Sequence, residues 1–176
     1  GRNLYGCWTG NGSSQPNLGI YDAIKEAVGN NGEVVYARGS NVFANPDWEA
    51  AGQIKNFDVG RDSRSAEDMI KEAVEVAKNS DVVIATLGEL TDMTGESQSR
   101  ADLEMPDVQR DLFKALLKTG KPVVLLYITG RPVAMRWDKA NAPVIVETWH
   151  GGTEAAHAIA DVVFGDRNPS GKLTTT

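Results

Sequence analysis

Residues 86–106 read TLGELTDMTGESQSRADLEMP, a stretch that is rich in carboxylates. Its five acidic residues are Glu89, Asp92, Glu96, Asp102 and Glu104, and its single basic residue is Arg100. Carboxylates placed beside a substrate can act as general acids and bases, whereas a run of acidic residues with no such placement is a solvated loop. The segment alone leaves both interpretations open, so its position in the fold has to decide between them.

Apolar runs and helical patterns alternate on either side of this acidic loop. Runs rich in valine, isoleucine and leucine predict strands at residues 4–8, 33–39, 81–88, 122–130 and 143–149. Patterns with a helical period predict helices near residues 17–28, 65–79, 106–119 and 152–164. Residues 39–64 are rich in turn formers and are expected to form an irregular or partly helical insertion.

Helix start and stop signals support this order of elements. Ser65 precedes the helical run AEDMIKEAVEVAKNS, Pro106 stands at the first turn of the next helix, and Gly120 closes it. The chain is therefore predicted to be α/β, with a mostly parallel, doubly wound sheet of about five to six strands and helices on both faces. We expect residues 1–176 to form one such three-layer α/β/α sandwich domain.

The acidic loop follows Leu87 and Gly88, at the end of a predicted strand. Parallel α/β sheets place their functional sites outside the carboxyl ends of the strands, so this is where a site is expected. Three other segments should reach the same edge, namely GCWTGNGSSQP, TGRPVAMRW and TWHGGTE. Their tryptophans, glycines, arginines and amides suit a surface that faces a sugar better than one that binds phosphate.

Composition and missing motifs exclude several classes of function. The net charge of −6 and the pI near 4.9 argue against a nucleic-acid or anionic-membrane partner. No apolar run approaches the roughly 20 residues of a membrane span. Cys7 is the single cysteine, and His150 and His157 are seven residues apart, so we expect no metal site. Nor does the sequence contain GxGxxG, GxxxxGK[ST] or GxSxG, so no cofactor is expected.

Longer stretches carry a family resemblance. GELTDMTGESQSRADLEMPDVQRDLFKALLKTGKPVVLLYITGRPVAMRW and APVIVETWHGGTEAAHAIADVVFGDRNPSGKL resemble the second, α/β-sandwich domain of glycoside hydrolase family 3, in particular the bacterial periplasmic or secreted β-glucosidase type. The chain departs from the usual pattern at Ala155 and Ala156, where relatives have two glycines, and at Thr174, where they have proline. These departures affect local packing and not the proposed chemistry.

The resemblance implies an active site shared between two domains. A (β/α)8 barrel, expected to precede this domain in the protein, would supply the aspartate nucleophile and most contacts to a β-glucoside or oligosaccharide. This domain would supply the general acid/base, at the position of Glu96 in TGESQSR. A retaining glycosidase uses such a pair of carboxyl groups about 5–5.5 Å apart. The domain alone is expected to be inactive, and the complete protein to be periplasmic or secreted.

Other residues have roles that the resemblance implies less directly. Glu89 is the second choice for the acid and could instead position the loop, while Arg100 and Asp102 are expected to order it through charge-assisted hydrogen bonds. Trp8 is expected either to stack on a sugar in the +1 subsite or to pack in the core. Met93 either lines the aglycone side or fills a gap. Trp149 is expected in the core or at a domain interface. The alternative function is a non-catalytic, flavodoxin-like module that binds a ligand or partner through the same edge.

Overall fold

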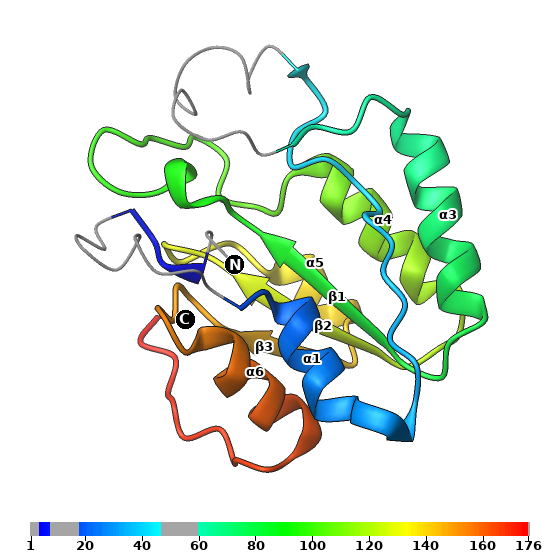
Figure 1. Ribbon diagram of the computed structural model, residues 1–176. Coiled ribbons are helices and arrows are strands. Elements are labelled where there is room, and N and C mark those ends of the chain that lie inside the picture. The colour runs from blue at the N-terminus through cyan, green and yellow to red at the C-terminus, as the bar shows by residue number, and fades with distance from the viewer. Residues whose placement is uncertain (1–3, 8–17, 47–59, 176) are drawn as a thin grey trace.

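Three apolar runs form the sheet of the protein, whose computed structural model describes residues 4–7, 18–46 and 60–175. The strands are β1 (Val83–Gly88), β2 (Val123–Ile128) and β3 (Val144–Glu147), and they pair in the order β1-β2-β3. Both pairings are parallel, with Leu125 opposite Ala85 on one side and Ile145 on the other. The carboxyl ends of the strands therefore lie at one edge of the sheet, where the acidic loop leaves β1 (Figure 1).

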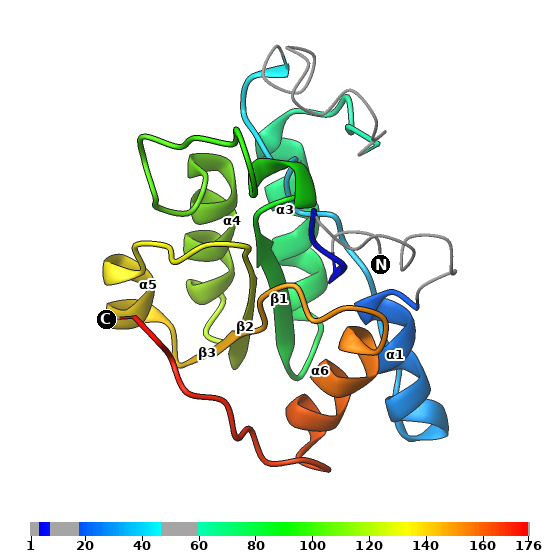
Figure 2. The ribbon, with the colours of Figure 1, turned by 90° about the vertical axis from the view of Figure 1, so that its left-hand side faces the viewer.

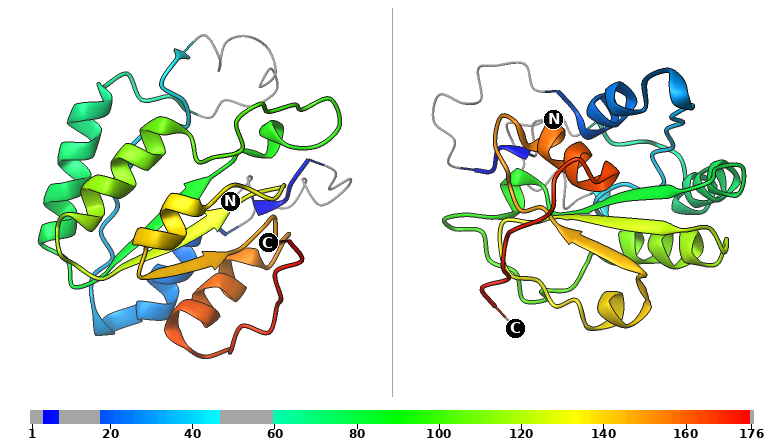
Figure 3. Two further views of the ribbon diagram at one scale, coloured as in Figure 1. Left: turned by 180° about the vertical axis from the view of Figure 1, so that it is seen from behind. Right: turned by 90° about the horizontal axis from the view of Figure 1, so that it is seen from below.

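Helices cover both faces of this sheet. They are α1 (Ile20–Val28), α3 (Ala66–Lys78), α4 (Asp107–Leu117), α5 (Arg136–Asn141) and α6 (Ala155–Phe164), with 3-10 turns at Gly29–Asn31 and Thr91–Met93. Figure 2 shows α3 and α4 on one face and α1 and α6 on the other. The short helix α5 lies beside α4 on the same face of the sheet (Figure 3). There Trp137 of α5 packs edge to face on Phe113 of α4, with ring centroids 6.1 Å apart. The predicted α/β fold is confirmed.

Each strand contributes alternate residues to the two apolar cores, as the pleat of a β-strand requires. Leu125 and Tyr127 of β2 belong to the core beneath α3 and α4, whereas Leu126 and Ile128 belong to the core beneath α1 and α6. Because helices cover both faces, β2 is apolar or aromatic at every position and is the most deeply buried strand. The continuous apolar run that predicted this strand thus reflects burial on both sides.

The helix boundaries follow the capping signals of the sequence. Ser65 Oγ accepts a hydrogen bond from the Asp68 N–H at 3.0 Å and so caps α3. Pro106 directly precedes α4, and Gly120 adopts a φ of +74° just after that helix. Gly165 ends α6 in the left-handed conformation. The four predicted helices are confirmed, while α5 was not predicted.

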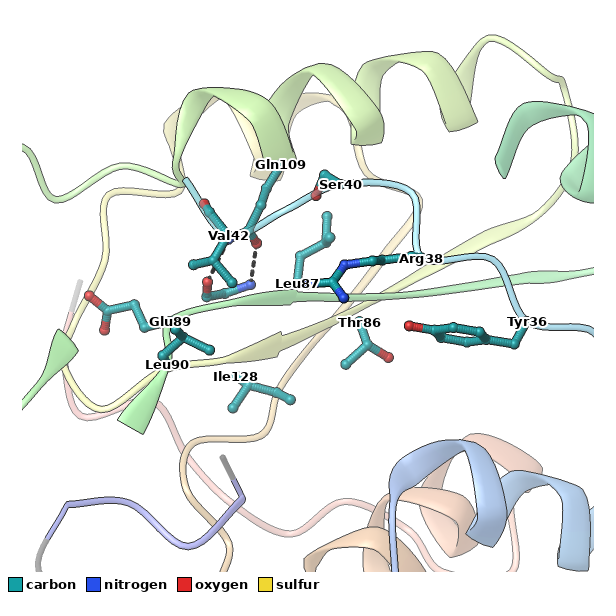
Figure 4. Close-up of a pocket in the computed structure, with 11 residues that line it drawn as sticks. Tyr36, Arg38, Ser40, Val42, Thr86, Leu87, Glu89, Leu90, Gln109 and Ile128 are labelled. Carbon is teal, nitrogen blue, oxygen red and sulfur yellow. Dashed lines mark hydrogen bonds between the residues drawn. The ribbon is translucent and has the colours of Figure 1, made fainter. Parts of the chain in front are cut away.

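The predicted strand at residues 33–39 is wrong. The segment runs beside β1 (Figure 4) without forming a backbone ladder with it in the described chain, and Val35 and Tyr36 are exposed. Instead, the side-chain amide of Gln109 accepts the Gly88 N–H at 2.7 Å and donates to the Gly88 carbonyl at 2.9 Å. The outer backbone groups at the end of β1 are therefore satisfied by a side chain.

The predicted strand at residues 4–8 is also wrong over its described part, residues 4–7. Leu4 and Tyr5 are buried as their apolar character indicates, but Gly6 adopts a φ of +82° and turns the chain out of an extended conformation. The Leu4 carbonyl accepts the Gly152 N–H at 2.9 Å and so fixes the loop before α6. The described sheet therefore has three strands, fewer than the five to six predicted.

His157 connects α6 to α1 through two carboxylates. Its Nδ1 lies 2.9 Å from Glu154 Oε2, and its Nε2 lies 3.5 Å from Glu26 Oε2. The hydrogen bond to Glu154, with a smaller contribution from Glu26, raises the pKa of His157 above its ordinary value of 6.5. Because the folded-state pKa is raised, the resulting stabilisation is complete below about pH 6.5 and is lost as the pH rises through the folded-state pKa.

Replacing Glu154 with glutamine is expected to lower the pKa of His157 toward its ordinary value, because the largest cause of the shift is removed. NMR titration of the imidazole resonances measures this directly. Glu67→Gln, an exposed change on α3, is the control and should leave the titration unchanged. An unaltered pKa in the Glu154→Gln variant would contradict the assignment.

Candidate functional site

The chain leaves β1 through a turn that has no room for a side chain at Gly88. Gly88 has a φ of +134°, and a Cβ at this position would lie 2.0 Å from the carbonyl oxygen of Ile128 in β2. Glu89 follows directly, and its N–H donates to the same Ile128 oxygen at 2.8 Å. This close approach of two backbones brings the Glu89 side chain to the carboxyl edge of the sheet.

The Glu89 carboxylate is buried between two guanidinium groups. Its side chain is 1% exposed, and its Oε1 lies 2.7 Å from Arg100 Nη1 and 3.2 Å from Arg131 Nε. The Arg131 Nε–H is not aligned for a hydrogen bond, so that contact is an ion pair only. The Gly130 N–H also approaches Oε2 at 3.5 Å. These two cations offset the free-energy cost of burying the carboxylate. Arg100 belongs to the acidic loop itself, whereas Arg131 belongs to the loop after β2.

Arg131 reaches from the loop after β2 to the backbone of the acidic loop. Its Nη2 donates to the carbonyl oxygen of Met93 and, at 3.0 Å, to that of Gln98. Thr94, between these two residues, is buried, and a Cβ at Gly130 would lie 2.4 Å from its Oγ1. The acidic loop therefore packs directly on the segment that carries Arg131.

Glu96 lies at the tip of a tight turn between the two carbonyls that Arg131 contacts. The Gln98 N–H donates to the Gly95 carbonyl at 3.2 Å, which closes a four-residue turn with Glu96 and Ser97 at its centre. Gly95 has a φ of +106°, and Ser97 has a φ of +63°, which is uncommon for a residue other than glycine. Glu96 is exposed at this tip and projects from an otherwise anchored loop.

A second set of contacts fixes the end of the loop before α4. Arg100 Nη2 donates to the Glu104 carbonyl at 2.7 Å, and Asp102 Oδ1 accepts the Glu104 N–H at 2.9 Å. The Glu104 carboxylate lies 2.6 Å from Arg110 Nη2 of α4. Arg100 thus connects the start of the loop, through Glu89, to its end through charge-assisted contacts.

The start of the loop packs on the base of the insertion. Leu90 and Met93 are buried against Val42 and Phe43, and Met93 Sδ accepts the Leu90 N–H at 3.3 Å. This packing gives Met93 a place among apolar side chains, with 7% of its surface exposed. The insertion, described at residues 39–46 and 60–64, therefore supports the start of the acidic loop through apolar contacts.

The last residue of β3 brings a further carboxylate to the same edge, and the loop after β3 brings an imidazole. Glu147 Oε1 accepts hydrogen bonds from Thr129 Oγ1 at 2.9 Å and from the Trp149 N–H at 3.2 Å. Burial raises the pKa of Glu147, although these two hydrogen bonds oppose the shift. His150 Nε2 lies 3.5 Å from Thr94 Oγ1 and so contacts the acidic loop.

A cavity of about 340 Å³ lies beside the outer edge of β1. Segment 36–42 and β1 line it from two sides, with Gln109 between them (Figure 4). Glu89 borders the cavity, but Glu96 is not among its lining residues. It is therefore a gap next to the anchored end of the loop. Where the structure describes the chain, no three histidine, cysteine or acidic side chains are grouped so as to hold a metal ion.

Comparison with known proteins decides the family. A sequence profile described as Glycosyl hydrolase family 3 C-terminal domain matches residues 1–176. The chain belongs to glycosyl hydrolase family 3. This family 3 domain is 42% identical over 172 residues to a periplasmic beta-glucosidase of Salmonella typhimurium and 39% identical over 157 residues to a beta-xylosidase of Formosa agariphila. These matches cover 98% and 89% of the chain.

Solved structures agree with this membership. A beta-glucosidase from Listeria innocua, in complex with isofagomine, matches 98% of the family 3 domain with a TM-score of 0.78 and 26% identity. The chain spans 22% of the Salmonella relative, 19% of the Formosa relative and 21% of the Listeria chain. It therefore corresponds to about a fifth of each of these proteins.

The structure joins two of the site residues predicted for the family 3 domain directly, because Glu89 and Arg100 form an ion pair. Met93 packs with Leu90 at the start of the same loop, and Asp102 lies at its far end. Glu96 lies apart from them at the tip. Trp8 lies outside the described residues. Trp149, expected in the core or at a domain interface, is half-buried with a φ of +51°.

Sequence reasoning missed Arg131, Gln109 and Glu147 as individual residues. The segment TGRPVAMRW, which contains Arg131, was expected at this edge of the sheet, but its sequence indicated no role for the arginine. Gln109 gave no signal, because its amide acts on β1 from a neighbouring helix. Glu147 ends the β3 run PVIVETW and could have been found as a carboxylate at a strand end.

None of the helices in the described ranges combines the length and the apolar character that crossing a membrane requires.

Proposed function

We propose that the chain is a single α/β-sandwich domain of a retaining β-glucosidase and acts together with a (β/α)8 barrel domain of the same protein. Membership of family 3 and the β-glucosidase relatives support this proposal. The observation that carries it is the position of Glu96, an exposed carboxylate at the tip of an anchored turn on the carboxyl edge of the sheet. A carboxylate in this position can reach into a site formed with another domain.

In the proposed mechanism, Glu96 first protonates the oxygen of the departing group while an aspartate of the barrel attacks the anomeric carbon. Glu96 then removes a proton from the water that hydrolyses the glycosyl-enzyme intermediate. The result is net retention of configuration. Because both carboxyl groups are needed, the domain by itself is proposed to be inactive.

The other acidic-loop residues are proposed to support Glu96. Glu89 is too deeply buried and too closely paired with two arginines to transfer a proton to a substrate. This favours a structural role for Glu89 over the role of general acid, for which it is the second candidate. Arg100 and Asp102 are proposed to order the loop, and the burial of Met93 favours gap filling over contact with the aglycone. Trp8 is retained as a residue proposed for the +1 subsite.

The proposed substrates are oligosaccharides and aryl or alkyl glycosides with a terminal β-linked glucosyl unit, and the proposed location is the periplasm. The location rests on the relative from Salmonella typhimurium. The Formosa agariphila beta-xylosidase makes β-xylosides the second candidate class. Comparing kcat/KM for p-nitrophenyl β-glucoside and β-xyloside on the complete protein distinguishes the two.

Azide rescue tests the role of Glu96. In a Glu96→Ala variant of the complete protein, the glycosyl-enzyme intermediate lacks its base, and azide needs none in order to attack. Added azide is therefore expected to raise kcat for 2,4-dinitrophenyl β-glucoside and to yield the β-glucosyl azide, identified by NMR. The unsubstituted protein is the control and should form no azide adduct. Formation of the α-azide, or no rescue at all, would contradict the proposed role.

A further inference from the structure

We infer that Arg131 is a positioning residue for Glu96 and that the buried Glu89 carboxylate fixes the orientation of Arg131. This inference rests on the proposed function, because it assigns a role relative to Glu96 as the acid/base. Arg131 belongs to the loop after β2, far in sequence from the residues that it contacts. Arg131 contacts backbone oxygens of the acidic loop and the Glu89 carboxylate. Its effect on the reaction would therefore come from the position that it gives Glu96.

The first argument is the closed ring that Arg131 forms with the acidic loop. Its Nη2 carries two N–H groups, and it donates to the carbonyls of Met93 and Gln98. These oxygens bracket the turn, so the guanidinium joins the two ends of a six-residue segment with Glu96 near its middle. Within the turn, the Gln98 N–H donates to the Gly95 carbonyl, a hydrogen bond that closes the turn but does not fix it to the rest of the domain. Arg131 is therefore a direct restraint on the direction in which the turn projects.

The second argument is the backbone conformation of Ser97. A left-handed conformation at a residue other than glycine is strained and persists only where the surroundings impose it. Ser97 has a φ of +63° directly after Glu96. The neighbouring contacts that fix this turn are those of Arg131 to Gln98 and Met93. Without them, we expect the turn to relax and Glu96 to move.

The third argument is the way in which Glu89 orients the arginine. Glu89 Oε1 contacts Nε of Arg131, while Nη2 on the other side of the same guanidinium contacts the loop. One planar group thus connects the end of β1 to the turn. A lysine has a single nitrogen and cannot make both contacts in this geometry. Because Glu89 also pairs with Arg100, its carboxylate cannot rotate away.

The experiment uses the complete protein with Arg131→Lys and Arg131→Met. The matched control is Arg110→Met, because the Arg110 side chain has nearly the same exposure, 17% against 18%, and pairs with Glu104 without contacting residues 93–98. The quantity to compare is kcat/KM for phenyl β-glucoside, which needs proton donation, and for 2,4-dinitrophenyl β-glucoside, which does not. Both values report formation of the glycosyl-enzyme intermediate.

A misplaced acid is expected to lower kcat/KM for the phenyl glucoside about 10- to 100-fold in both Arg131 variants. The dinitrophenyl value should change less than about threefold, and the Arg110→Met variant should not distinguish the two substrates. If Arg131→Met fails to fold, Arg131→Lys still provides the test because it keeps a cation beside Glu89. Equal losses on both substrates, or no loss in Arg131→Lys, would overturn the inference. If Glu96→Ala also fails to distinguish the substrates, the proposed function itself is wrong.

Discussion

Replacing Glu96 with alanine in the complete protein is expected to lower kcat/KM for phenyl β-glucoside by about 10²- to 10⁴-fold, the range that general acid catalysis contributes. Phenoxide is a poor leaving group and departs slowly without a proton. For 2,4-dinitrophenyl β-glucoside, whose leaving group departs as a stable anion, kcat/KM should change much less. Its kcat should nevertheless fall, because in the proposed mechanism hydrolysis of the intermediate also needs Glu96 as a base.

The acidic loop provides a matched control for this experiment. Glu104 is a half-exposed carboxylate in the same loop whose side chain pairs with Arg110, so Glu104→Gln should alter both kcat/KM values by no more than a few fold. The comparison separates loss of the acid from a general change in the loop's charge. Near-normal hydrolysis of phenyl β-glucoside by the Glu96→Ala variant would exclude Glu96 as the acid.

Replacing Gly88 with alanine is expected to destabilise the fold by about 4 kcal/mol, among the largest effects of single substitutions. The added Cβ would lie 2.0 Å from the Ile128 carbonyl oxygen, so β1 and β2 would have to move apart at the point where Glu89 begins the loop. The backbone φ of +134° adds strain for any residue with a side chain. For a domain of this size, the loss corresponds to a fall of about 8–16 °C in the midpoint of thermal unfolding.

Gly120 provides the control for this substitution. It also has a positive φ, +74°, but a Cβ there would meet nothing within 4 Å. Gly120→Ala should therefore cost only the backbone strain, about 1 kcal/mol. A similar loss of stability in the two variants, measured by thermal unfolding, would show that the close approach of Gly88 to β2 is unimportant.

Much of the fold could be predicted from local signals. The apolar run of β2 is recognisable because burial on both faces leaves no polar position, and the runs of β1 and β3 each contain a single polar residue. Ser65 and Pro106 mark helix starts through their own backbone and side-chain chemistry. The run at 33–39 looks similar but forms no backbone ladder with β1 in the described chain, and the outer backbone groups of Gly88 bind Gln109 instead. Apolar composition indicates burial or extension and does not determine pairing.

The location of the candidate site could be predicted from the sequence, but only some of its residues could. A loop after a parallel strand indicates a site, and the family resemblance selects Glu96 from several carboxylates. The anchors could not be predicted, because they connect residues that are distant in sequence. Arg131 contacts Met93 and Gln98 across 38 and 33 residues, and the pattern TGRP contains no sign of these partners.

The two arginines contact the acidic loop largely through backbone oxygens, which every residue type provides. Arg131 accordingly places no direct requirement on the side chain of Gln98, nor Arg100 on that of Glu104. Substitutions at these positions can alter the exposed surface of the loop while the path of the backbone is preserved. The side chains of the loop can therefore diversify during evolution while the proposed acid/base at its tip keeps its place.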